Sequence, residues 1–422
     1  MSSKPRRPIP KLKYPRVAGQ TVRCLVGIDD TDSSRGNCTT YLAYRIAADL
    51  APTARVLPYP RLVRLNPNIP FKTRGNAAVS LLVETESPSQ AFDSICSKVS
   101  ELSDVEGGAN SGVVFLSDVR KSRLFLPVYL SALSGVVNPH RIRRLLAQHE
   151  VKSFELGNGM GLVGAASALA FDETFDHTYE LIAYRGRESF GTPRILDSTS
   201  VREMERTTWP HTFNSYDHQK RKVLIAPHGP DPVFLGLRGD SPQVVLKAFR
   251  LVSYSEDLQG YMVYMTNQHT DAHLKGELDW KVFSSGWTEG WVDSPSIGPG
   301  GHVYFALLDG TKKRRCAVYE PTGDLRRVAK MLRDGDFIRA YGGVRRPSTS
   351  HPRILNVEKI EVISLAKSRS RLLVCGTYIA SPRANRHLTK PLVRYGREMH
   401  GRACPDVAGW LRTSAIRTRA PA

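Results

Sequence analysis

Residues 22–41 read VRCLVGIDDTDSSRGNCTTY, and this stretch decides the fold of the first domain. Residues 22–28 are apolar and rich in β-branched side chains, which predicts a short buried strand. Three carboxylates follow at once, Asp29, Asp30 and Asp32, in a loop rich in Ser, Gly and Asn. Apolar residues then recur at helical spacing from Thr39, which predicts a helix. A strand, an acid cluster and a helix N-terminus in this order are typical of a metal and phosphate site.

The acid cluster also has a simpler interpretation. Asp-rich turns between a strand and a helix are common, and one of the acids usually caps the helix. The residue chemistry alone leaves the catalytic and the capping interpretations open.

The length and composition limit the class of protein. A chain of 422 residues is expected to form about three domains, because single cores stop growing near roughly 250–300 residues. We expect no membrane span, since no run of 18 or more apolar residues occurs, and no secretory signal, since the N-terminus is basic and Pro-rich. The six Cys residues include no CxxC pair, which is typical of reduced thiols and favours a cytoplasmic protein.

The net charge of +20 is concentrated at the two ends of the chain. Residues 1–20 hold six Lys and Arg and no acid, and residues 366–422 hold twelve Lys and Arg and two acids. We expect the first segment to be a disordered basic arm. Two basic ends on a nearly neutral body favour a polyanionic partner, and nucleic acid in particular.

A second cluster of polar residues lies in 55–76, which we expect to be a connection between strands. Pro67, Pro70 and Gly75 would fix its path, and its cations beside the acid cluster would suit a triphosphate. A strand over 77–83 and a helix over 88–102 are predicted to follow. The candidate phosphate-binding residues are Arg61, Arg64, Lys72, Arg74 and Asn76. The alternative is a plain exposed connection.

A glycine-rich run follows at 157–164. Gly159, Gly161 and Gly164 satisfy GxGxxG, so a dinucleotide cofactor has to be considered. Against it, Glu180, at the offset of a ribose-binding acid, lies inside a predicted strand over 178–184. We therefore favour close approach of Gly157, Gly159 and Gly161 to ATP phosphates, or tight packing.

Two further units are predicted downstream. Residues 178–268 have the order β-α-β-β-α-β, with strands over 179–184, 223–226, 233–237 and 261–265, a capping box at Ser200 and a cap at Ser241; this order is typical of a ferredoxin-like unit. Residues 275–365 predict five short strands, over 280–283, 302–308, 315–319, 337–341 and 354–363. Five such strands favour an OB barrel, with an SH3-like barrel as the alternative.

Several motifs in the correct order resemble one family. The run GIDDTDSSRGNCTTYLA at 27–43 resembles the opening signature of the archaeal tRNA 2-agmatinylcytidine synthetases. RLVRLNPNIPFKTRGN at 61–76, PHGPDPV at 227–233 and GGHVYFALLDG at 300–310 resemble later signatures. The resemblance implies a multidomain α/β and α+β protein: an arm at 1–20, an ATP-dependent kinase-like α/β domain at 21–172, a ferredoxin-like domain at 173–273, an OB-fold at 274–365 and a basic segment at 366–422.

The resemblance also implies an activity. Members of this family couple agmatine to C2 of the wobble cytidine of the isoleucine tRNA with a CAU anticodon, through a phosphorylated cytidine, so that the tRNA reads AUA. The cofactors would be ATP and Mg²⁺, with the metal on Asp29 and Asp30, and Thr39 matches the threonine that is phosphorylated. Agmatine carries a guanidinium group and needs carboxylates, for which the candidates are Asp217, Asp231 and Asp271, and His228 is a further candidate residue of this site.

The last segment departs from the family pattern. The family's zinc ribbon needs four soft ligands, whereas here Cys375 and Cys404 are 29 residues apart, with His387 and His400 near them. We therefore expect no structural zinc. The remaining alternatives are a nucleic-acid-binding OB protein that has lost catalysis and, more weakly, a dinucleotide-dependent enzyme.

Overall fold

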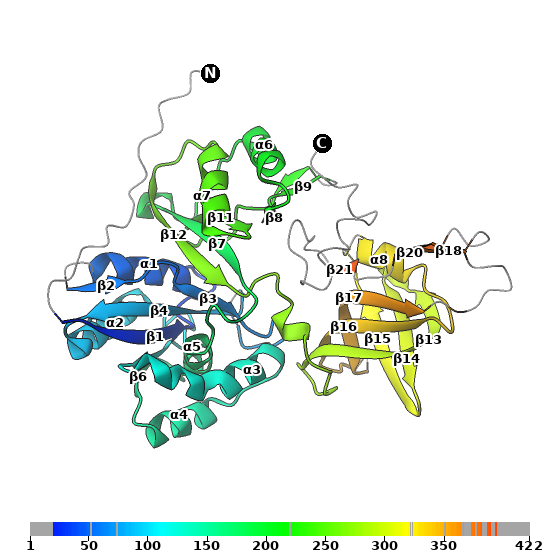
Figure 1. Ribbon diagram of the computed structural model, residues 1–422, viewed down its shortest axis with the longest axis horizontal. Helices are drawn as coiled ribbons and strands as arrows, with labels where there is room; N and C mark the ends of the chain where they lie inside the picture. Colours follow the sequence, from blue (N-terminus) through cyan, green and yellow to red (C-terminus); the bar gives the residue numbers. More distant parts are fainter. Residues whose placement is uncertain are drawn as a thin grey trace.

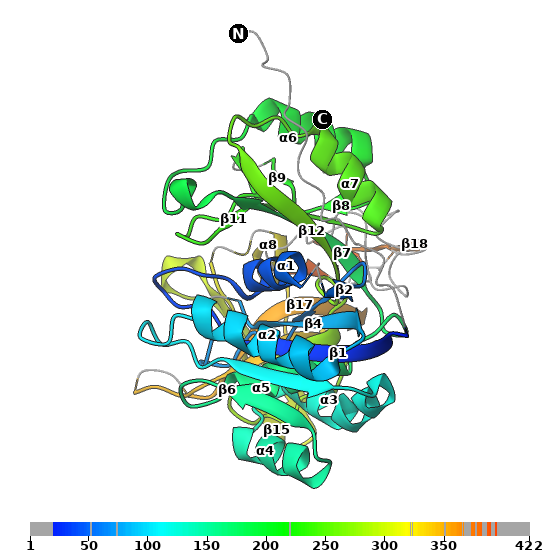
Figure 2. The same cartoon turned by 90° about the vertical axis from the view of Figure 1, so that its left-hand side faces the viewer.

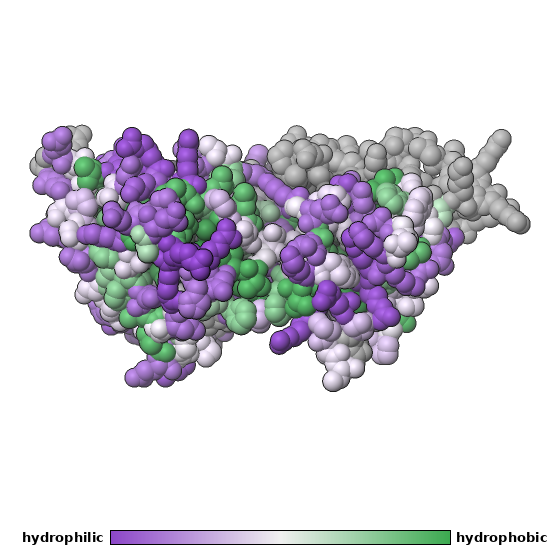
Figure 3. Space-filling model, turned by 90° about the horizontal axis from the view of Figure 1, so that it is seen from below, coloured by the Kyte–Doolittle hydropathy of each residue, from purple (hydrophilic) through white to green (hydrophobic). Residues whose placement is uncertain are grey.

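The computed structural model describes residues 20–50, 53–72, 75–218, 221–320, 322, 324–349, 352–364 and 366, and the backbone of four short strands beyond them. Figure 1 shows a body of helices on a large sheet, with a β-barrel beside it. Seen from below, hydrophobic side chains gather toward the middle of the molecule, where body and barrel meet (Figure 3). No helix of the described ranges is both long and apolar enough to cross a bilayer.

The first half of the body is an antiparallel sheet covered on both faces. Its strands are β1 (Val22–Asp29), β2 (Ala54–Val56), β3 (Arg61–Arg64), β4 (Ala77–Thr85), β5 (Gly112–Leu116) and β6 (Lys152–Glu155). They lie in the order β6-β5-β1-β4-β3, with β2 also paired to β4. One face is covered by α1 (Thr39–Asp49) and α2 (Pro88–Leu102), the other by α3 (Leu126–Ser134), α4 (Pro139–Gln148) and α5 (Gly161–Leu169).

Burial on both faces explains the composition of β1. Cys24 and Val26 belong to the core under α1 and α2, whereas Leu25 belongs to the core under α3, α4 and α5. A strand between two helical layers needs apolar residues at every position, so it shows no alternation. The expected strand at 22–28, the helix from Thr39 and the helix over 88–102 are confirmed.

The second half of the body extends the same sheet. Its strands β7 (Thr178–Arg185), β8 (Thr212–Phe213), β11 (Val233–Gly239) and β12 (Leu258–Thr266) lie in the order β12-β7-β11-β8, with α6 (Ser198–Thr208) and α7 (Pro242–Leu251). Parallel pairing of β12 with β3 joins the halves. Figure 2 shows α1 where the two halves meet, and there the hydroxyls of Tyr184 and Tyr264 both donate to the carbonyl of Thr40, at 2.9 and 2.7 Å.

Two details of the second half differ from the sequence prediction. The expected strand over 223–226 is wrong: β10 (Lys222–Val223) pairs with β9 (Tyr216–Asp217) in a separate ladder, and β8 takes the place beside β11. Helix α6 begins before the expected cap, because Asp197 accepts the backbone N–H groups of Thr199 and Ser200. Ser200 therefore lies inside the helix. The Ser241 cap of α7 is confirmed.

The barrel consists of five strands. They are β13 (Ser285–Ile297), β14 (Val303–Asp309), β15 (Lys312–Val318), β16 (Phe337–Arg345) and β17 (Ile354–Ser364), with α8 (Asp324–Ala329) between β15 and β16. Their order is β15-β14-β13-β16-β17, and β17 pairs with β15 to close the barrel. The expected strand over 280–283 is wrong, because Trp280 and Phe283 have φ angles of +52° and +68° and form a turn before β13.

Candidate active site

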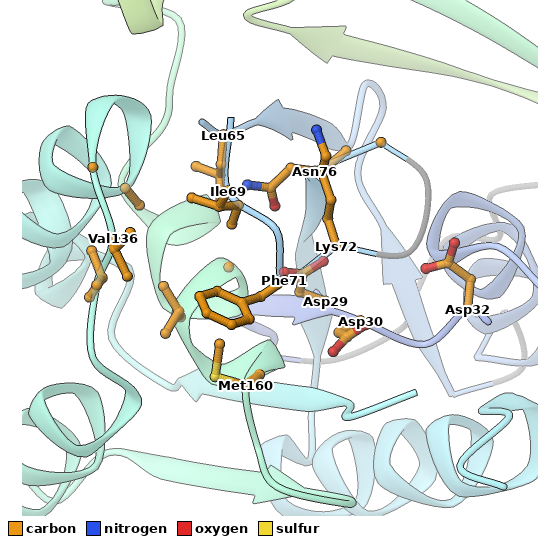
Figure 4. Close-up of a pocket in the computed structure, with 17 residues that line it drawn as sticks. Asp29, Asp30, Asp32, Leu65, Ile69, Phe71, Lys72, Asn76, Val136 and Met160 are labelled. Carbon is orange, nitrogen blue, oxygen red and sulfur yellow. The ribbon is translucent and has the colours of Figure 1, made fainter. Parts of the chain in front are cut away.

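The first two carboxylates form the floor of a pocket at the end of β1. Asp29 is the last residue of the strand, and Asp30 follows it with a φ of +57°, which turns the chain out of the sheet. Both line a pocket of about 650 Å³. In Figure 4 they lie together, while Asp32 lies apart from them, beside the start of α1. The three acids therefore form a pair with a neighbour and not one cluster.

The opposite wall of this pocket comes from the loop between β3 and β4. This loop contributes Lys72 and Asn76, together with an apolar surface that includes Phe71. The other apolar residues of the pocket come from this loop, from β4, from α3 and the segment after it, and from the start of α5: Leu65, Ile69, Ala77, Ala132, Val136, Val137, Met160 and Val163. A pocket with acids at one end and a mainly apolar wall suits a ligand with a charged part and a flat part.

Burial and mutual repulsion raise the pKa of both carboxyls. Burial raises the pKa of Asp29 well above its ordinary value, and the charges of Asp30 and Asp32 add to this effect. The pKa of Asp30 rises to about 6, mainly through burial and then through Asp32, while hydrogen bonds from Asn110 oppose the rise. Two adjacent carboxylates with raised pKa values are stabilised by a cation placed between them.

The acid pair fits the way Mg²⁺ is bound. Mg²⁺ usually takes one or two carboxylates and completes its shell with waters and substrate phosphates. The described residues contain no group of three or more His, Cys, Asp or Glu placed to hold a metal ion. Asp29 and Asp30 thus fit a metal that arrives with a phosphate ligand, and they do not form a preformed protein cage.

Thr39 lies in a second pocket that adjoins the first. It is the first residue of α1, it is buried, and its hydroxyl accepts from that of Thr31 at 3.1 Å. This pocket, of about 850 Å³, shares Asp32, Gly75 and Ala77 with the first. Cys38, the N-cap residue, makes no side-chain cap to the helix. An uncapped helix start facing a pocket is favourable for an anion.

The candidate phosphate ligands separate into two groups. Lys72 and Asn76 line the first pocket, and Arg64 lines the second. Two of these side chains also bond within the protein: the amine of Lys72 donates to the carbonyl of Pro67, and the amide of Asn76 donates to the carbonyl of Asn66 at 2.9 Å. Arg61 lies elsewhere: since β3 is a strand and not a loop, Arg61 and Arg64 point to opposite faces. Arg61 faces Glu173 at 4.0 Å, and burial lowers its pKa. Arg74 lies outside the described residues.

The glycine run packs against protein atoms. A Cβ on Gly157 would lie 2.6 Å from the side chain of Asn110, and one on Gly161 would lie 2.5 Å from the backbone of Gly112. Gly159 is similarly close to Glu155, and none of these three glycines lines the pocket of the acid pair or the pocket of Thr39. Gly164 does line the first pocket, where a Cβ would lie 1.8 Å from a carboxylate oxygen of Asp29. These contacts favour tight packing of α5 against β1.

The dinucleotide alternative is wrong. The strand before the glycine run, β6, pairs antiparallel with β5, whereas a dinucleotide fold needs a parallel βαβ unit. Glu180 cannot bind a ribose, because it lies on β7 between two guanidinium groups, Arg238 at 3.0 Å and Arg64 at 3.4 Å. Burial alone would raise the pKa of Glu180, but these two charges outweigh it and lower the pKa.

Glu180 is also a site residue that the sequence prediction missed. It lines the second pocket with Arg64 and Arg238 and fixes the directions of both guanidinium groups. An acid in the middle of an apolar strand was the available signal, since such a residue needs a buried partner.

The four candidate agmatine ligands lie in different places. Asp231 lines the second pocket and accepts from Arg194. Asp271 lines a third pocket, of about 1240 Å³, and pairs with Lys359 at 2.8 Å. His228 lines a fourth pocket, and Asp217, on β9, lines none of these four pockets. The structure thus does not bring the four together.

Comparison with known proteins identifies the family. Three family models match: the TiaS TCKD domain over residues 25–158, the TiaS FLD domain over 159–273 and an OB-fold nucleic acid binding domain over 287–363. The isoleucine-tRNA 2-agmatinylcytidine synthetase TiaS of Cenarchaeum symbiosum is 42% identical over 353 residues, covering 82% of this chain and 78% of that protein. The chain belongs to the TiaS family of tRNA 2-agmatinylcytidine synthetases.

Solved structures of this synthetase family agree with the sequence motifs. The complex of TiaS with its isoleucine tRNA and ATP has a TM-score of 0.77 at 32% identity, covering 90% of this chain and 92% of that chain. The complex of TiaS with the same tRNA, AMPCPP and agmatine has a TM-score of 0.76 at 33% identity, with the same coverage. The resemblance inferred from the motifs is confirmed, and so are a mixed α/β protein and its OB-fold.

Proposed function

We propose that this chain is an ATP-dependent tRNA-modifying ligase that conjugates agmatine to C2 of the wobble cytidine of the isoleucine tRNA with a CAU anticodon. The observation that carries the proposal is the carboxylate pair of Asp29 and Asp30, which shares one pocket with Lys72 and adjoins the pocket of Thr39. Family membership and the complexes of similar proteins with ATP, agmatine and an isoleucine tRNA support the same activity.

The chemistry requires activation of the base. The C2 oxygen of cytosine is a poor leaving group, and transfer of a phosphoryl group from ATP converts it to a phosphate ester. The primary amine of agmatine then attacks C2, the C–O bond breaks, and phosphate leaves with the electron pair while the amine loses a proton. The protein must therefore bind a triphosphate, a flipped cytidine and a diamine close together.

The residues of the first pocket suit the triphosphate. Asp29 and Asp30 would hold Mg²⁺, which when bound neutralises charge on the phosphate oxygens. Lys72 and Arg64 would bind the transferred group from the loop and from β3, and Arg74 is retained as a candidate from the same loop. The apolar wall with Phe71 and Met160 suits the flat face of a nucleobase.

The residues of the second pocket suit the acceptor side. Thr39 at the start of α1 would carry a phosphate, because the helix N-terminus stabilises that charge. Asp231 lines the same pocket as Thr39. We therefore rank it above Asp217, His228 and Asp271 as the candidate ligand of the agmatine guanidinium.

The larger parts of the chain would divide these tasks. Residues 21–172 would form the kinase-like domain and residues 173–273 a ferredoxin-like domain, which the order β7-α6-β8-β11-α7-β12 supports. The barrel and the basic ends would bind the tRNA. A cytoplasmic location stays a prediction.

The direct test is incubation of the purified protein with ATP, labelled agmatine and a transcript of the CAU isoleucine tRNA. We expect label in the RNA, dependent on ATP and absent when the wobble cytidine is replaced by uridine. Absence of label under every condition would indicate a catalytically inactive binding protein. The acid pair and the ATP complexes of similar proteins speak against this alternative.

A further inference from the structure

The loop between β3 and β4, residues 65–76, lies between the body and the barrel. Its base is closed by the N–H of Leu65, which donates to the carbonyl of Asn76 at 2.9 Å. One side of the loop lines the pocket of Asp29 and Asp30, and the other lines the third pocket, whose far wall includes Asn356 and Glu358 of β17. Lys72 lines both pockets. The position of this loop therefore sets the position of a candidate phosphate ligand.

One side chain at the base of the loop is fully buried and makes every hydrogen bond it can. The amide nitrogen of Asn66 donates to the carbonyls of Phe283 at 2.7 Å and Gly135 at 3.3 Å. Its amide oxygen accepts from the hydroxyl of Ser285 at 2.8 Å and from the N–H of Asn68 at 3.0 Å. A carboxamide has two donors and an oxygen that accepts two bonds, so all four are satisfied.

These bonds join the loop to the barrel. Ser285 is the first residue of β13, and Phe283 belongs to the turn before it. A second amide strengthens the link: Asn68 donates to the hydroxyl of Ser285 at 2.7 Å. A Cβ on Gly343, the β16 partner of Ser285, would lie 1.6 Å from the amide nitrogen of Asn68, so the barrel backbone leaves room for this side chain.

The backbone of Asn66 completes the connection on the body side. Its N–H donates to the carbonyl of Ala132 in α3, and its carbonyl accepts from the amide of Asn76 at 2.9 Å. Ala132 and Asn76 both line the pocket of the acid pair. A single buried residue thus bonds to the barrel, to α3 and to a wall of the candidate ATP pocket.

We propose that Asn66 is a positioning residue that fixes the loop of Lys72 to the barrel, so that the seating of the barrel sets the geometry of the phosphate pocket. The proposal rests on the proposed function, because it takes the pocket of Asp29, Asp30 and Lys72 as the ATP site. Binding of tRNA to the barrel would then act on phosphoryl transfer through Ser285 and Asn68, without a barrel residue touching ATP.

The test removes the barrel side of the network. Ser285→Ala deletes the hydroxyl that bonds to both asparagines, and Asn68→Ala is the second variant should the first fail to fold. The matched control is Ser284→Ala, since this buried neighbour donates to the carbonyl of Lys281 and makes no bond to the described residues of the loop. ATP affinity is measured without tRNA and agmatine, and tRNA affinity is measured separately.

Ser285→Ala removes two hydrogen bonds, and we expect it to weaken ATP binding by roughly three- to tenfold, because only part of the lost bonding acts on the geometry of the pocket. tRNA affinity should stay within about twofold, and Ser284→Ala should leave both affinities within about twofold of wild type at a similar loss of thermal stability. Equal ATP affinities of the Ser285 and Ser284 variants would overturn the proposal, as would a parallel loss of ATP and tRNA affinity. Wild-type protein that binds ATP but transfers no agmatine would contradict the proposed function, but it would not contradict the role proposed for Asn66.

Discussion

At the scale of single residues, the site depends on two adjacent carboxylates that the protein keeps close together. Burial and repulsion raise the pKa of Asp29 and Asp30, and among the described residues neither forms an ion pair with Lys or Arg. Such a pair is costly without a cation. We interpret the cost as the condition for binding a metal together with a phosphate.

Thr39 gives the first prediction. Thr39→Ala should abolish phosphorylation of the protein and formation of the product, while the fold is kept, because its hydroxyl makes one hydrogen bond, to Thr31, worth roughly 1 kcal/mol. Mass spectrometry after incubation with ATP locates the phosphate. Thr40→Ala is the control, since Thr40 lies next to Thr39 in α1 and should leave the phosphate in place. A phosphate that persists in Thr39→Ala would exclude this residue.

The sequence predicted that the acids follow a strand and that a helix begins at Thr39, but not which cations line the pockets beside them. Arg61 and Arg64 are three residues apart, and they face opposite sides because β3 is a strand. The pattern RLVR does not alternate, because Leu62 and Val63 are buried in the cores on opposite faces of the sheet, and the prolines and glycine that follow favour a loop. The pairing of Glu180 with Arg64 and Arg238 could not be predicted, because it depends on the packing of β3, β7 and β11.

At the scale of secondary structure, the contact between β1 and α5 holds the acid pair in place. Gly27 allows this approach, since a Cβ there would lie 2.0 Å from the carbonyl oxygen of Ala165. Gly164 allows the carboxylate of Asp29 to lie against the helix. Glycines of the run thus allow α5 to pack closely against the end of β1, where Asp29 lies.

Gly164→Ala therefore gives the second prediction. The new methyl group would displace Asp29, so we expect at least a tenfold loss of ATP cleavage and a destabilisation of about 1–3 kcal/mol. Ser167→Ala, on the same helix, removes a hydroxyl that bonds to the carbonyl of Val163 and should keep activity. Steady-state ATP cleavage and thermal unfolding measure the two effects. Full activity of Gly164→Ala would show that Asp29 tolerates displacement.

The elements that could be predicted have strong periodic patterns. Helix α2 has its predicted bounds because Pro88 begins it and its apolar residues recur at helical spacing. Strand β13 was misplaced because Gly286 and Gly290 interrupt its pattern, and both are needed where neighbouring backbones approach closely. The short strand β8 carries no signal in two residues and is defined by its pairing to β11.

At the scale of the whole molecule, the barrel lies beside the body, which contains the candidate pockets of the acid pair and of Thr39 (Figure 1). The barrel contacts the body through buried polar pairs, which include Lys359 with Asp271 and Ser285 with Asn66. Such contacts fix one arrangement of the two parts, because a shift would leave buried polar groups unpaired.

The basic C-terminal segment gives the third prediction. Residues 366–422 contain twelve Lys and Arg, and deleting them should weaken tRNA binding. Each lost phosphate contact should also lower the log–log salt slope by roughly 0.7–0.9. Filter binding at several salt concentrations measures both. An unchanged slope after the deletion would show that this segment does not contact phosphates.

The metal content gives the fourth prediction. We expect no stoichiometric zinc in the purified protein, because Cys375 and Cys404 are not part of CxxC pairs. The side chains of both, and of His387 and His400, lie outside the described residues. Elemental analysis decides the question, and one equivalent of tightly bound zinc would contradict the expectation.

The measurement that tests the central claim most directly compares ATP cleavage and tRNA binding in Asp30→Asn. The account predicts a loss of ATP cleavage of roughly a hundredfold or more, because the acid pair no longer holds the metal and phosphate, with tRNA affinity within about threefold. Asp279→Asn, on an exposed turn far along the chain, is the control and should keep both. ATP cleavage by Asp30→Asn at the wild-type rate would contradict the account, because the acid pair would then have no part in the reaction.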